Sequence, residues 1–221
     1  MGRKSKRSGR RSAIRWIIIA VLVILILTVR LVEEIGPERS PSDRFVVSKV
    51  IDGDTVELLG GDRLRLLSID TPERDDPLYD EARELLTGLA LGKTADIRFA
   101  NRRRDRYGRL LGYLYVDSLF VNQIILENGL GYLYLFKDTD LDREETSQLL
   151  AAQRRAIDRK VGLWALPREA EEYYLALPNS FRMHRPGCAS LRASDKSRCR
   201  RFSTREEGMY EGLSPCRNCC P

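Results

Sequence analysis

Three short apolar segments follow one another between residues 45 and 69, and they constrain the fold more than any other feature of the sequence. The segments are residues 45–51, 55–59 and 63–69, and the turns between them read Asp52-Gly53-Asp54 and Gly60-Gly61-Asp62. Val, Ile and Leu are frequent in strands, and short Asp/Gly runs between strands form tight turns. The pattern therefore predicts three consecutive strands of one sheet.

The region up to residue 162 continues with strand-like and helical patterns. Apolar residues at helical spacing predict a helix at 81–91, and strands are expected at 95–100 and 110–116. Two more helices are expected at 119–128 and 142–160. Five strands in two groups with about three helices predict an α+β fold, with the strands in a small β-barrel. Periodicity alone does not distinguish this barrel from another α+β arrangement.

The N-terminal region combines a basic segment with an apolar run. Residues 1–15 contain 7 Lys or Arg and no acid, and residues 16–29 contain no charge. We expect an uncleaved transmembrane signal anchor at 16–32, with residues 1–15 as a basic cytoplasmic tail and everything after the anchor outside the membrane. The alternative is secretion after cleavage of a signal peptide, but no small-x-small cleavage site follows the run. Residues 33–43, with two prolines, are expected to form a linker.

The net charge of +6 points to nucleic acid at first sight, but the basic residues are concentrated at the two ends of the chain. Residues 16–180 contain 22 basic and 28 acidic residues, whereas residues 181–221 contain 9 basic and 4 acidic ones. The main domain is therefore acidic. Any contact that it makes with nucleic acid must use local basic positions, because a broad positive surface is not expected.

Carboxylates stand beside turns of the predicted sheet. Asp54 and Asp70 are at strand ends, so their carboxylates can converge from different strands. Two carboxylates with a backbone carbonyl and water make an oxygen-only site that suits a hard cation such as Ca²⁺. Glu73 follows Asp70 by three residues, behind a proline that stiffens the loop, and is a candidate to take a proton from a water molecule.

Two arginines complete this set of candidates. Arg65 lies in the third predicted strand and Arg109 begins another, and both can direct a planar guanidinium group at a phosphate. A phosphodiester under attack gains negative charge on its oxygens, which a cation and two guanidinium groups stabilise. Together with the three carboxylates, these arginines predict hydrolysis of a phosphodiester bond.

The order and spacing of several motifs resemble the staphylococcal nuclease (thermonuclease) family. The motifs are Val50-Ile51-Asp52-Gly53-Asp54-Thr55, Arg65-Leu66-Leu67, Asp70-Thr71-Pro72-Glu73, Asp105-Arg106-Tyr107-Gly108-Arg109, Val121-Asn122, Asn128-Gly129-Leu130 and Gly162-Leu163-Trp164. The resemblance covers residues 44–166. It implies a five-stranded oligonucleotide-binding-type β-barrel with three helices, and Ca²⁺-dependent cleavage of DNA and RNA.

The resemblance also assigns roles to single residues. The implied calcium ligands are Asp54, Asp70 and the carbonyl of Thr71, and the implied catalytic residues are Arg65, Glu73 and Arg109. The loop after Glu73 is shorter than in the type enzyme of the family. The alternative is a catalytically silent nucleic-acid-binding module on the same fold. Silent copies are expected to lose metal carboxylates or phosphate arginines, and because all of them are present we favour the enzyme.

Aromatic and basic side chains near these motifs are candidate contacts for a nucleic acid strand. The resemblance places the base-stacking tyrosine at Tyr134 if one residue is dropped from the alignment, and Tyr132 is its rival. Stacking on an aromatic ring gives binding that tolerates any sequence. Arg106 and Tyr107, in the loop before Arg109, are further candidates, because basic residues there can guide the strand.

All five cysteines and the single histidine lie in the last 40 residues. His184, Cys188, Cys216 and Cys219 form two close pairs, which suits a tetrahedral Zn²⁺ site. The alternative is a module held by disulfides, as expected in an oxidising compartment. Cys199 and Cys220 are left over from this set and are available to pair with each other.

Residues 181–221 also resemble the small metal-binding module of the Ada DNA-repair protein. The matching residues are His184-Arg-Pro-Gly-Cys188, Phe202 to Gly208, and Pro215-Cys216 with Cys219-Cys220-Pro221. Histidine stands at 184 where that protein has cysteine. We expect residues 167–180 to be a linker to this module. The partners that the sequence indicates are DNA, RNA and a membrane; a membrane scaffold whose tail binds another protein is a weaker alternative.

Overall fold

The computed structural model describes residues 19, 21, 43–136 and 144–221. Residues 42–221 form one compact unit. Within the described residues, no helix is both long and apolar enough to cross a membrane. The predicted anchor at 16–32 falls outside the described residues except for Ile19 and Val21, as do the predicted basic tail and all but the last residue of the predicted linker at 33–43.

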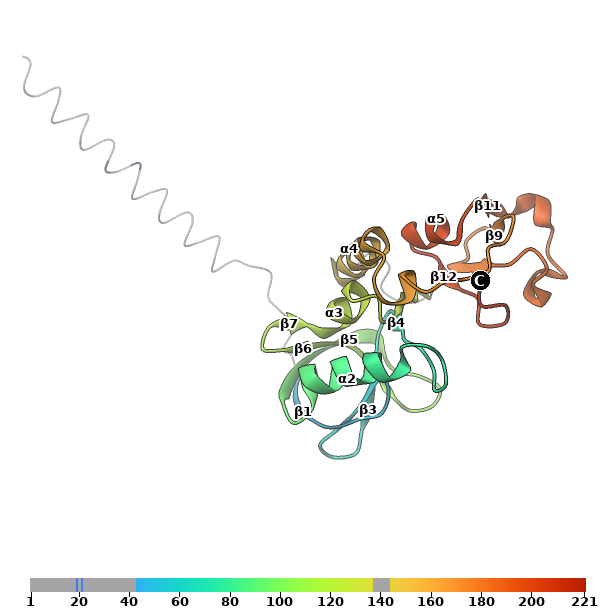
Figure 1. Cartoon of the computed structure of the whole chain (residues 1–221). Coiled ribbons are helices and arrows are strands. Elements are labelled where there is room, and N and C mark those ends of the chain that lie inside the picture. Colours follow the sequence, from blue (N-terminus) through green and yellow to red (C-terminus); the bar gives the residue numbers. More distant parts are fainter. Residues whose placement is uncertain (1–18, 20, 22–42, 137–143) are drawn as a thin grey trace, which may run out of the picture. The chain divides into compact units, whose positions relative to one another are not determined.

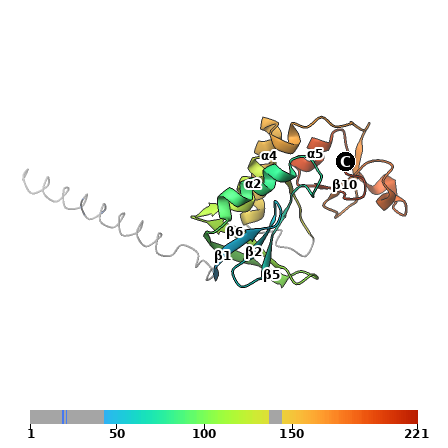
Figure 2. The ribbon, with the colours of Figure 1, turned by 60° about the horizontal axis from the view of Figure 1, so that its bottom comes forward.

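The centre of this unit is a closed barrel of five strands. Its strands are β1 (Asp43–Val50), β2 (Thr55–Leu58), β3 (Arg63–Leu66), β5 (Thr94–Arg104) and β6 (Leu110–Val116). The hydrogen-bonded order is β3-β2-β1-β5-β6, and a parallel pairing of β3 with β6 closes the barrel (Figures 1 and 2). The short β7 (Leu119–Phe120) extends the sheet beyond β6. The predicted α+β barrel is therefore confirmed.

Alternation along the strands separates the barrel interior from its outer face. In β3, Leu64 and Leu66 are fully buried, whereas Arg63 is exposed and Arg65 is partly exposed. Since successive side chains of a strand point to opposite faces, Arg65 must leave the barrel on the outside. The apolar pattern of β3 therefore fixes the side on which this arginine lies.

The third predicted strand, residues 63–69, is in fact two strands. Ser68 has a backbone φ of 60°, and this left-handed conformation turns the chain out of the barrel sheet. Residues 69–70 then form β4 (Ile69–Asp70), which pairs with β8 (Tyr132–Leu133) in a separate two-stranded sheet. The turn at Ser68 thus moves Asp70 away from the barrel wall and next to Tyr132.

Helices cover the barrel and carry the rest of the core. They are α2 (Tyr79–Ala90), α3 (Val121–Glu127), α4 (Glu144–Arg159) and the 3-10 turn η1 (Gly162–Trp164). A side chain at Gly129 or Gly162 would meet backbone atoms of the other segment, and both glycines have positive φ, so the end of α3 and the start of η1 touch backbone to backbone. The pair fixes η1 beside α3.

The predicted linker at 167–180 contains a strand of the C-terminal module, because β9 (Tyr174–Ala176) is the second strand of its sheet. The other strands are β10 (Arg182–His184), β11 (Arg200–Phe202) and β12 (Ser214–Pro215), in the order β11-β9-β10-β12. Two 3-10 turns, η2 (Ala189–Leu191) and η3 (Lys196–Arg198), and the short helix α5 (Arg205–Tyr210) complete it. The module's sheet therefore begins before residue 181.

The module packs against α4 and η1. Ala156 of α4 and Trp164 of η1 share one apolar cluster with Met183, Phe202 and Met209 of the module. The fully buried side chain of Gln153 connects the two parts: its Oε1 accepts the Leu133 N–H at 2.7 Å, and its Nε2 donates to the Met209 carbonyl at 2.6 Å. Barrel and module are thus joined by a common core and a buried hydrogen-bonded bridge.

Candidate active site

Three of the predicted site residues meet at one edge of the barrel. A single nitrogen of Arg65, Nη2, lies 2.8 Å from Asp54 Oδ2 and 3.0 Å from Asp70 Oδ1. The two carboxylate oxygens are therefore neighbours, although Asp54 precedes β2 and Asp70 ends β4. The Thr71 N–H donates to Asp54 Oδ2 at 3.1 Å, which places the fourth predicted residue in the same group.

Local sequence explains why the Asp54 turn lies so close to Thr71. A Cβ atom on Gly53 would stand 2.7 Å from both Thr71 Oγ1 and the Cβ of Ala82 in α2. Only glycine therefore allows the turn to pack between the Asp70–Thr71 segment and α2. Asp52 Oδ1 accepts the Asp54 N–H at 3.0 Å and holds the turn in shape.

Negative charge is concentrated at this edge. Burial, together with the neighbouring Asp54, raises the pKa of Asp52 to about 6. Burial also raises the pKa of Asp70, although Arg65 and Arg217 oppose that shift. Burial and the neighbouring carboxylates both oppose the ionisation of these groups. A nearby cation would stabilise their ionised forms.

The donor set at this edge fits a hard cation. Asp54 and Asp70 offer carboxylate oxygens, and the Thr71 carbonyl belongs to the same group of residues. The predicted ligands at this edge are oxygen atoms, whereas softer metals prefer nitrogen or sulfur. Among the described residues, these carboxylates are not part of a compact group of three or more His, Cys, Asp or Glu side chains.

Glu73 is exposed on the loop that follows Thr71. Its N–H donates to Asp76 Oδ2 at 3.1 Å, and its carbonyl accepts the Asp76 N–H at 3.0 Å. These two bonds fix the backbone at Glu73 and leave its carboxylate in solvent. The residue lines a cavity of about 720 Å³ together with Asp70 and Thr71. Glu73 thus lines the same cavity as two of the three calcium candidates, Asp70 and Thr71.

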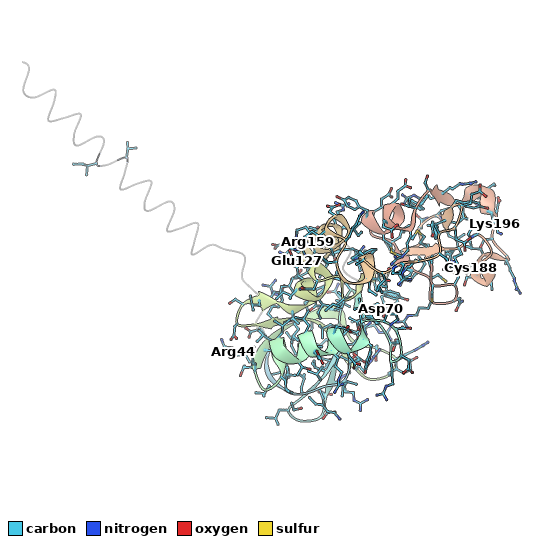
Figure 3. The ribbon with its side chains drawn as sticks, in the orientation of Figure 1. Arg44, Asp70, Glu127, Arg159, Cys188 and Lys196 are labelled. Atoms are coloured by element: carbon cyan, nitrogen blue, oxygen red, sulfur yellow. The ribbon has the colours of Figure 1, made fainter. Side chains whose placement is uncertain are left out.

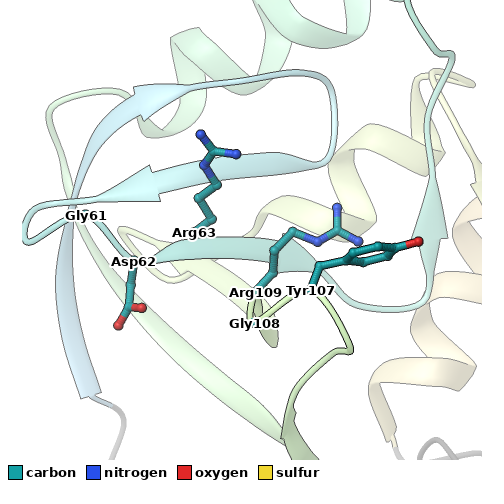
Figure 4. Close-up of a pocket in the computed structure, with 6 residues that line it drawn as sticks. All are labelled: Gly61, Asp62, Arg63, Tyr107, Gly108 and Arg109. Atoms are coloured by element: carbon teal, nitrogen blue, oxygen red, sulfur yellow. The ribbon is translucent and has the colours of Figure 1, made fainter.

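Arg109 immediately precedes β6, the strand that pairs with the strand of Arg65. Two residues later, Leu111 of β6 is paired with Arg65 of β3. The Arg109 Nε donates to Asp105 Oδ2 at 2.8 Å. Figure 4 shows Arg109 and Tyr107 in the wall of a second cavity, of about 380 Å³. In this structure Arg109 pairs with Asp105, whereas Arg65 contacts the carboxylates of Asp54 and Asp70.

The two loop candidates for nucleic acid contact, Arg106 and Tyr107, are both exposed. The Tyr107 side chain is 68% exposed, and the guanidinium carbon of Arg106 lies 4.7 Å from its ring centre. Arg109 is 5.6 Å from the same ring centre. Residues 101–104 lie beyond the predicted strand 95–100 but also belong to β5, so the arginines there extend from a strand.

The structure separates the two tyrosines that compete for the stacking role. Tyr132 accepts hydrogen bonds on its hydroxyl from Arg168 at 2.9 Å and Arg205 at 2.8 Å, and its ring packs edge-on against Trp164. Tyr132 is therefore a structural residue. Tyr134 is partly exposed, and the guanidinium carbon of Arg182 lies 3.5 Å from its ring centre. Arg182 therefore covers one face of the Tyr134 ring, and a base would need the other face.

Sequence reasoning did not find Arg217. Its Nη2 lies 2.6 Å from Asp70 Oδ1, the same oxygen that Arg65 contacts. Arg217 also lines the 720 Å³ cavity with Glu73. Figure 3 shows Asp70 on the side of the barrel where the C-terminal module lies. Arg217 stands between two predicted zinc ligands, and that position gave no signal of a contact 147 residues away in the chain.

The four predicted zinc ligands lie together in the module. Their ligand atoms are all within 4.8 Å of one another. His184 Nδ1 is 3.4 Å from Cys188 Sγ, and Cys188 Sγ is 4.0 Å from Cys216 Sγ. All five cysteines of the chain are free thiols in this structure. A tetrahedral ion with sulfur at about 2.3 Å separates two sulfurs by about 3.8 Å, whereas a disulfide requires about 2.05 Å. The spacing therefore fits a shared metal.

Backbone and side-chain donors surround these sulfurs. The Arg185 N–H donates to Cys219 Sγ at 3.4 Å, and Ser190 Oγ is 3.7 Å from Cys216 Sγ. Burial raises the pKa of the Cys219 thiol to about 12 and lowers the pKa of His184, which keeps the imidazole neutral and able to bind a metal. In metal sites, donors placed in this way orient the ligands.

Comparison with known proteins places the barrel in a family. Residues 63–166 match the family model described as "Staphylococcal nuclease homologue". A protein named "Uncharacterized endonuclease" from Escherichia coli O157:H7 is 34% identical over 123 residues, which cover 54% of this chain and 75% of that protein. The "Micrococcal nuclease" of Shigella flexneri is 27% identical over 142 residues, or 59% of this chain and 78% of that protein.

A third relative matches a larger share of the chain. The "Thermonuclease" of Staphylococcus hyicus is 26% identical over 165 residues, which cover 67% of this chain and 95% of that protein. The closed five-stranded barrel agrees with these matches. The chain therefore belongs to the staphylococcal nuclease homologue family, and it is a nuclease of the hydrolase class.

Proposed function

We propose that the protein is a calcium-dependent nuclease that hydrolyses phosphodiester bonds of both DNA and RNA. The main support for the proposal is that the carboxylates of Asp54 and Asp70 both contact one guanidinium nitrogen of Arg65. The Thr71 N–H donates to the same Asp54 carboxylate. A pair of carboxylates with a guanidinium group between them suits a centre that binds a cation and a phosphate together. The relatives named as nucleases support this proposal.

Each residue has a distinct part in the proposed reaction. Asp54, Asp70 and the Thr71 carbonyl would hold Ca²⁺, which neutralises charge on the phosphate oxygens when it is bound. Arg65 turns from the carboxylates to an equatorial oxygen of the phosphate. Glu73 accepts a proton from the attacking water, or orients that water, from its exposed position in the cavity.

Arg109 supplies the second guanidinium group. Its Nε donates to Asp105 Oδ2 at 2.8 Å. The two terminal nitrogens take no part in that bond and would donate to a phosphate oxygen. The charge that develops in the transition state would then be stabilised by two guanidinium groups. Arg106 and Tyr107 would contact the strand further along.

A calcium titration tests the enzyme directly. Residues 42–221 form one compact unit, so a fragment from Arg44 onward is suitable, with single-stranded DNA and RNA as separate substrates. Cleavage should depend on added Ca²⁺ in buffer without chelator, which leaves the cysteine cluster undisturbed. Tight binding of the strand with no cleavage at any Ca²⁺ concentration would instead support the silent binding module and refute the calcium-dependent enzyme.

Substitution of Glu73 tests the role of that residue. Glu73→Gln should lower kcat by about 100-fold or more, because loss of a general base typically costs that factor. Glu84→Gln, at an exposed carboxylate within α2, is the matched control and should retain full activity. Equal activity of the Glu73→Gln variant and the wild type would remove Glu73 from the proposed role.

We further propose that His184, Cys188, Cys216 and Cys219 bind a structural Zn²⁺. The ligand atoms lie within 4.8 Å of one another, and sulfurs at 4.0 Å are close to the edge of a tetrahedral site. Metal analysis of the purified protein should give one zinc ion per chain. Less than stoichiometric zinc, with no thiols that react after denaturation, would show that disulfides hold the module instead.

For localisation, we propose a single-pass membrane protein with its N-terminus in the cytoplasm. The support is the uncharged run at 16–29 behind 7 basic residues. Expression of the full chain in a bacterial host should place it in the membrane fraction, and removal of residues 1–32 should release it. A soluble exported product that begins after the apolar run would support the secreted alternative and refute the anchor.

A further inference from the structure

The C-terminal module reaches the nuclease site through one side chain. Arg217 lies in the turn between Cys216 and Cys219, and it donates to Asp70 Oδ1 at 2.6 Å. The family model ends at residue 166, so this arginine lies outside the part of the chain that matches it. Its contact with a predicted calcium ligand calls for an explanation of its own.

The turn that carries Arg217 has a defined conformation. The N–H groups of Cys219 and Cys220 both donate to the Cys216 carbonyl, at 3.3 and 2.8 Å, and the Cys216 N–H donates to the Met183 carbonyl at 2.9 Å. Cys216 itself is buried. The start of the turn is therefore fixed in the module core, and Arg217 projects from a rigid base toward the barrel.

Stability does not account for the contact. The Arg217 side chain is 60% exposed, and an ion pair of such an exposed group contributes at most about 1 kcal/mol. Asp70 already has Arg65 at 3.0 Å from the same oxygen. The main effect of a second arginine at this carboxylate is therefore an additional positive charge in the site. Its contribution to the stability of the fold is small.

The surroundings of Arg217 suit a phosphate. It lines the same 720 Å³ cavity as Asp70, Glu73 and Arg168, with walls from the barrel and from the module. Its guanidinium carbon is also 5.2 Å from the ring centre of Tyr134, the candidate for base stacking. An exposed guanidinium that contacts both the Asp70 carboxylate and the Tyr134 ring is placed to contact the backbone of a strand that enters this cavity.

We propose that Arg217 binds a backbone phosphate of the nucleic acid next to the one that is cleaved, so that the module forms one wall of the substrate groove. In the free protein Arg217 donates to Asp70. With substrate bound it exchanges this carboxylate for a phosphate oxygen. The proposal rests on the nuclease function and adds to it a substrate contact from outside the nuclease domain.

Steady-state kinetics of Arg217→Ala on single-stranded DNA at saturating Ca²⁺ test the proposal. Removal of one charge-assisted hydrogen bond to the substrate should raise KM by about tenfold, with kcat within about twofold of the wild type. The dependence of log KM on log salt should fall in slope by about 0.7, as expected when the protein neutralises one phosphate fewer on a single strand. Arg217→Lys, which keeps the charge without the planar fork, should recover part of the affinity.

Arg192→Ala is the matched control, because Arg192 is an exposed arginine of the same module, after η2. It should leave KM and the salt slope unchanged. An unchanged KM in Arg217→Ala would overturn the proposal. A higher rate or a lower Ca²⁺ requirement in that variant would also overturn it, because Arg217 would then be an inhibitor that competes with the cation. An inactive wild type would instead refute the proposed nuclease chemistry, independently of Arg217.

Discussion

Replacement of Gln153 by leucine should loosen the joint between barrel and module. The side chain is fully buried, and it satisfies one backbone N–H in β8 and one carbonyl in α5. Leucine fills a similar volume but offers no polar atom, so both backbone groups lose their partner. Each buried group left unpaired costs about 1–3 kcal/mol, and we therefore expect a loss of about 3 kcal/mol in the free energy of unfolding.

For a unit of this size, about 3 kcal/mol corresponds to a fall of roughly 10 °C in Tm. Thermal unfolding of the purified full chain, followed by circular dichroism, measures the change. Gln148→Leu is the control: Gln148 lies on the same helix, α4, but is only half-buried and bonds to Glu144. A shift below about 2 °C in Gln153→Leu would refute the reasoning, because the two unpaired backbone groups would then carry no measurable cost.

Three further changes follow from single contacts. Asn122→Ala removes a fully buried side chain that bonds two backbone groups, and it should lower the free energy of unfolding by about 3 kcal/mol, measured by urea denaturation. Asp105→Asn weakens the ion pair that orients Arg109 and should lower kcat/KM about tenfold, whereas equal activity would show that the pair has no role. Arg155 lowers the pKa of Glu127, so their pair stabilises the fold above the ordinary pKa of about 4.3, and this stability is lost as the pH falls. Glu127→Gln should therefore lower Tm slightly at pH 7 and less at pH 3, in parallel melts with the wild type.

The sequence predicted the barrel well because its strands carry a clear signal. Alternating apolar residues, as in β3, and short glycine turns specify strand positions locally. The break at Ser68 carried no such signal. A serine with positive φ is uncommon, and its conformation depends on partners far along the chain, such as Tyr113 at 3.2 Å from its hydroxyl. The separate pairing of Asp70 with Tyr132 was therefore not predicted.

The residues of the candidate site also divide into those that a local sequence pattern predicts and those that it does not. Asp54, Arg65, Asp70 and Thr71 were predicted, because their motifs match a known pattern and each sits at a defined strand position. Arg217 was missed, because its contact arises only when the module packs against the barrel. Long-range packing of this kind depends on buried surfaces from several elements, and no local pattern of residues encodes it.

The position of β9 limits how such a chain can be recombined. Because β9 lies between β11 and β10, a graft that begins at residue 181 would lack an interior strand and leave the edges of its two neighbours unpaired. A barrel cut at residue 166 would in turn expose Ala156 and Trp164 to solvent. A functional chimaera with another nuclease barrel therefore has to carry residues 174–221 as one piece and supply a matching apolar face on its own last helix.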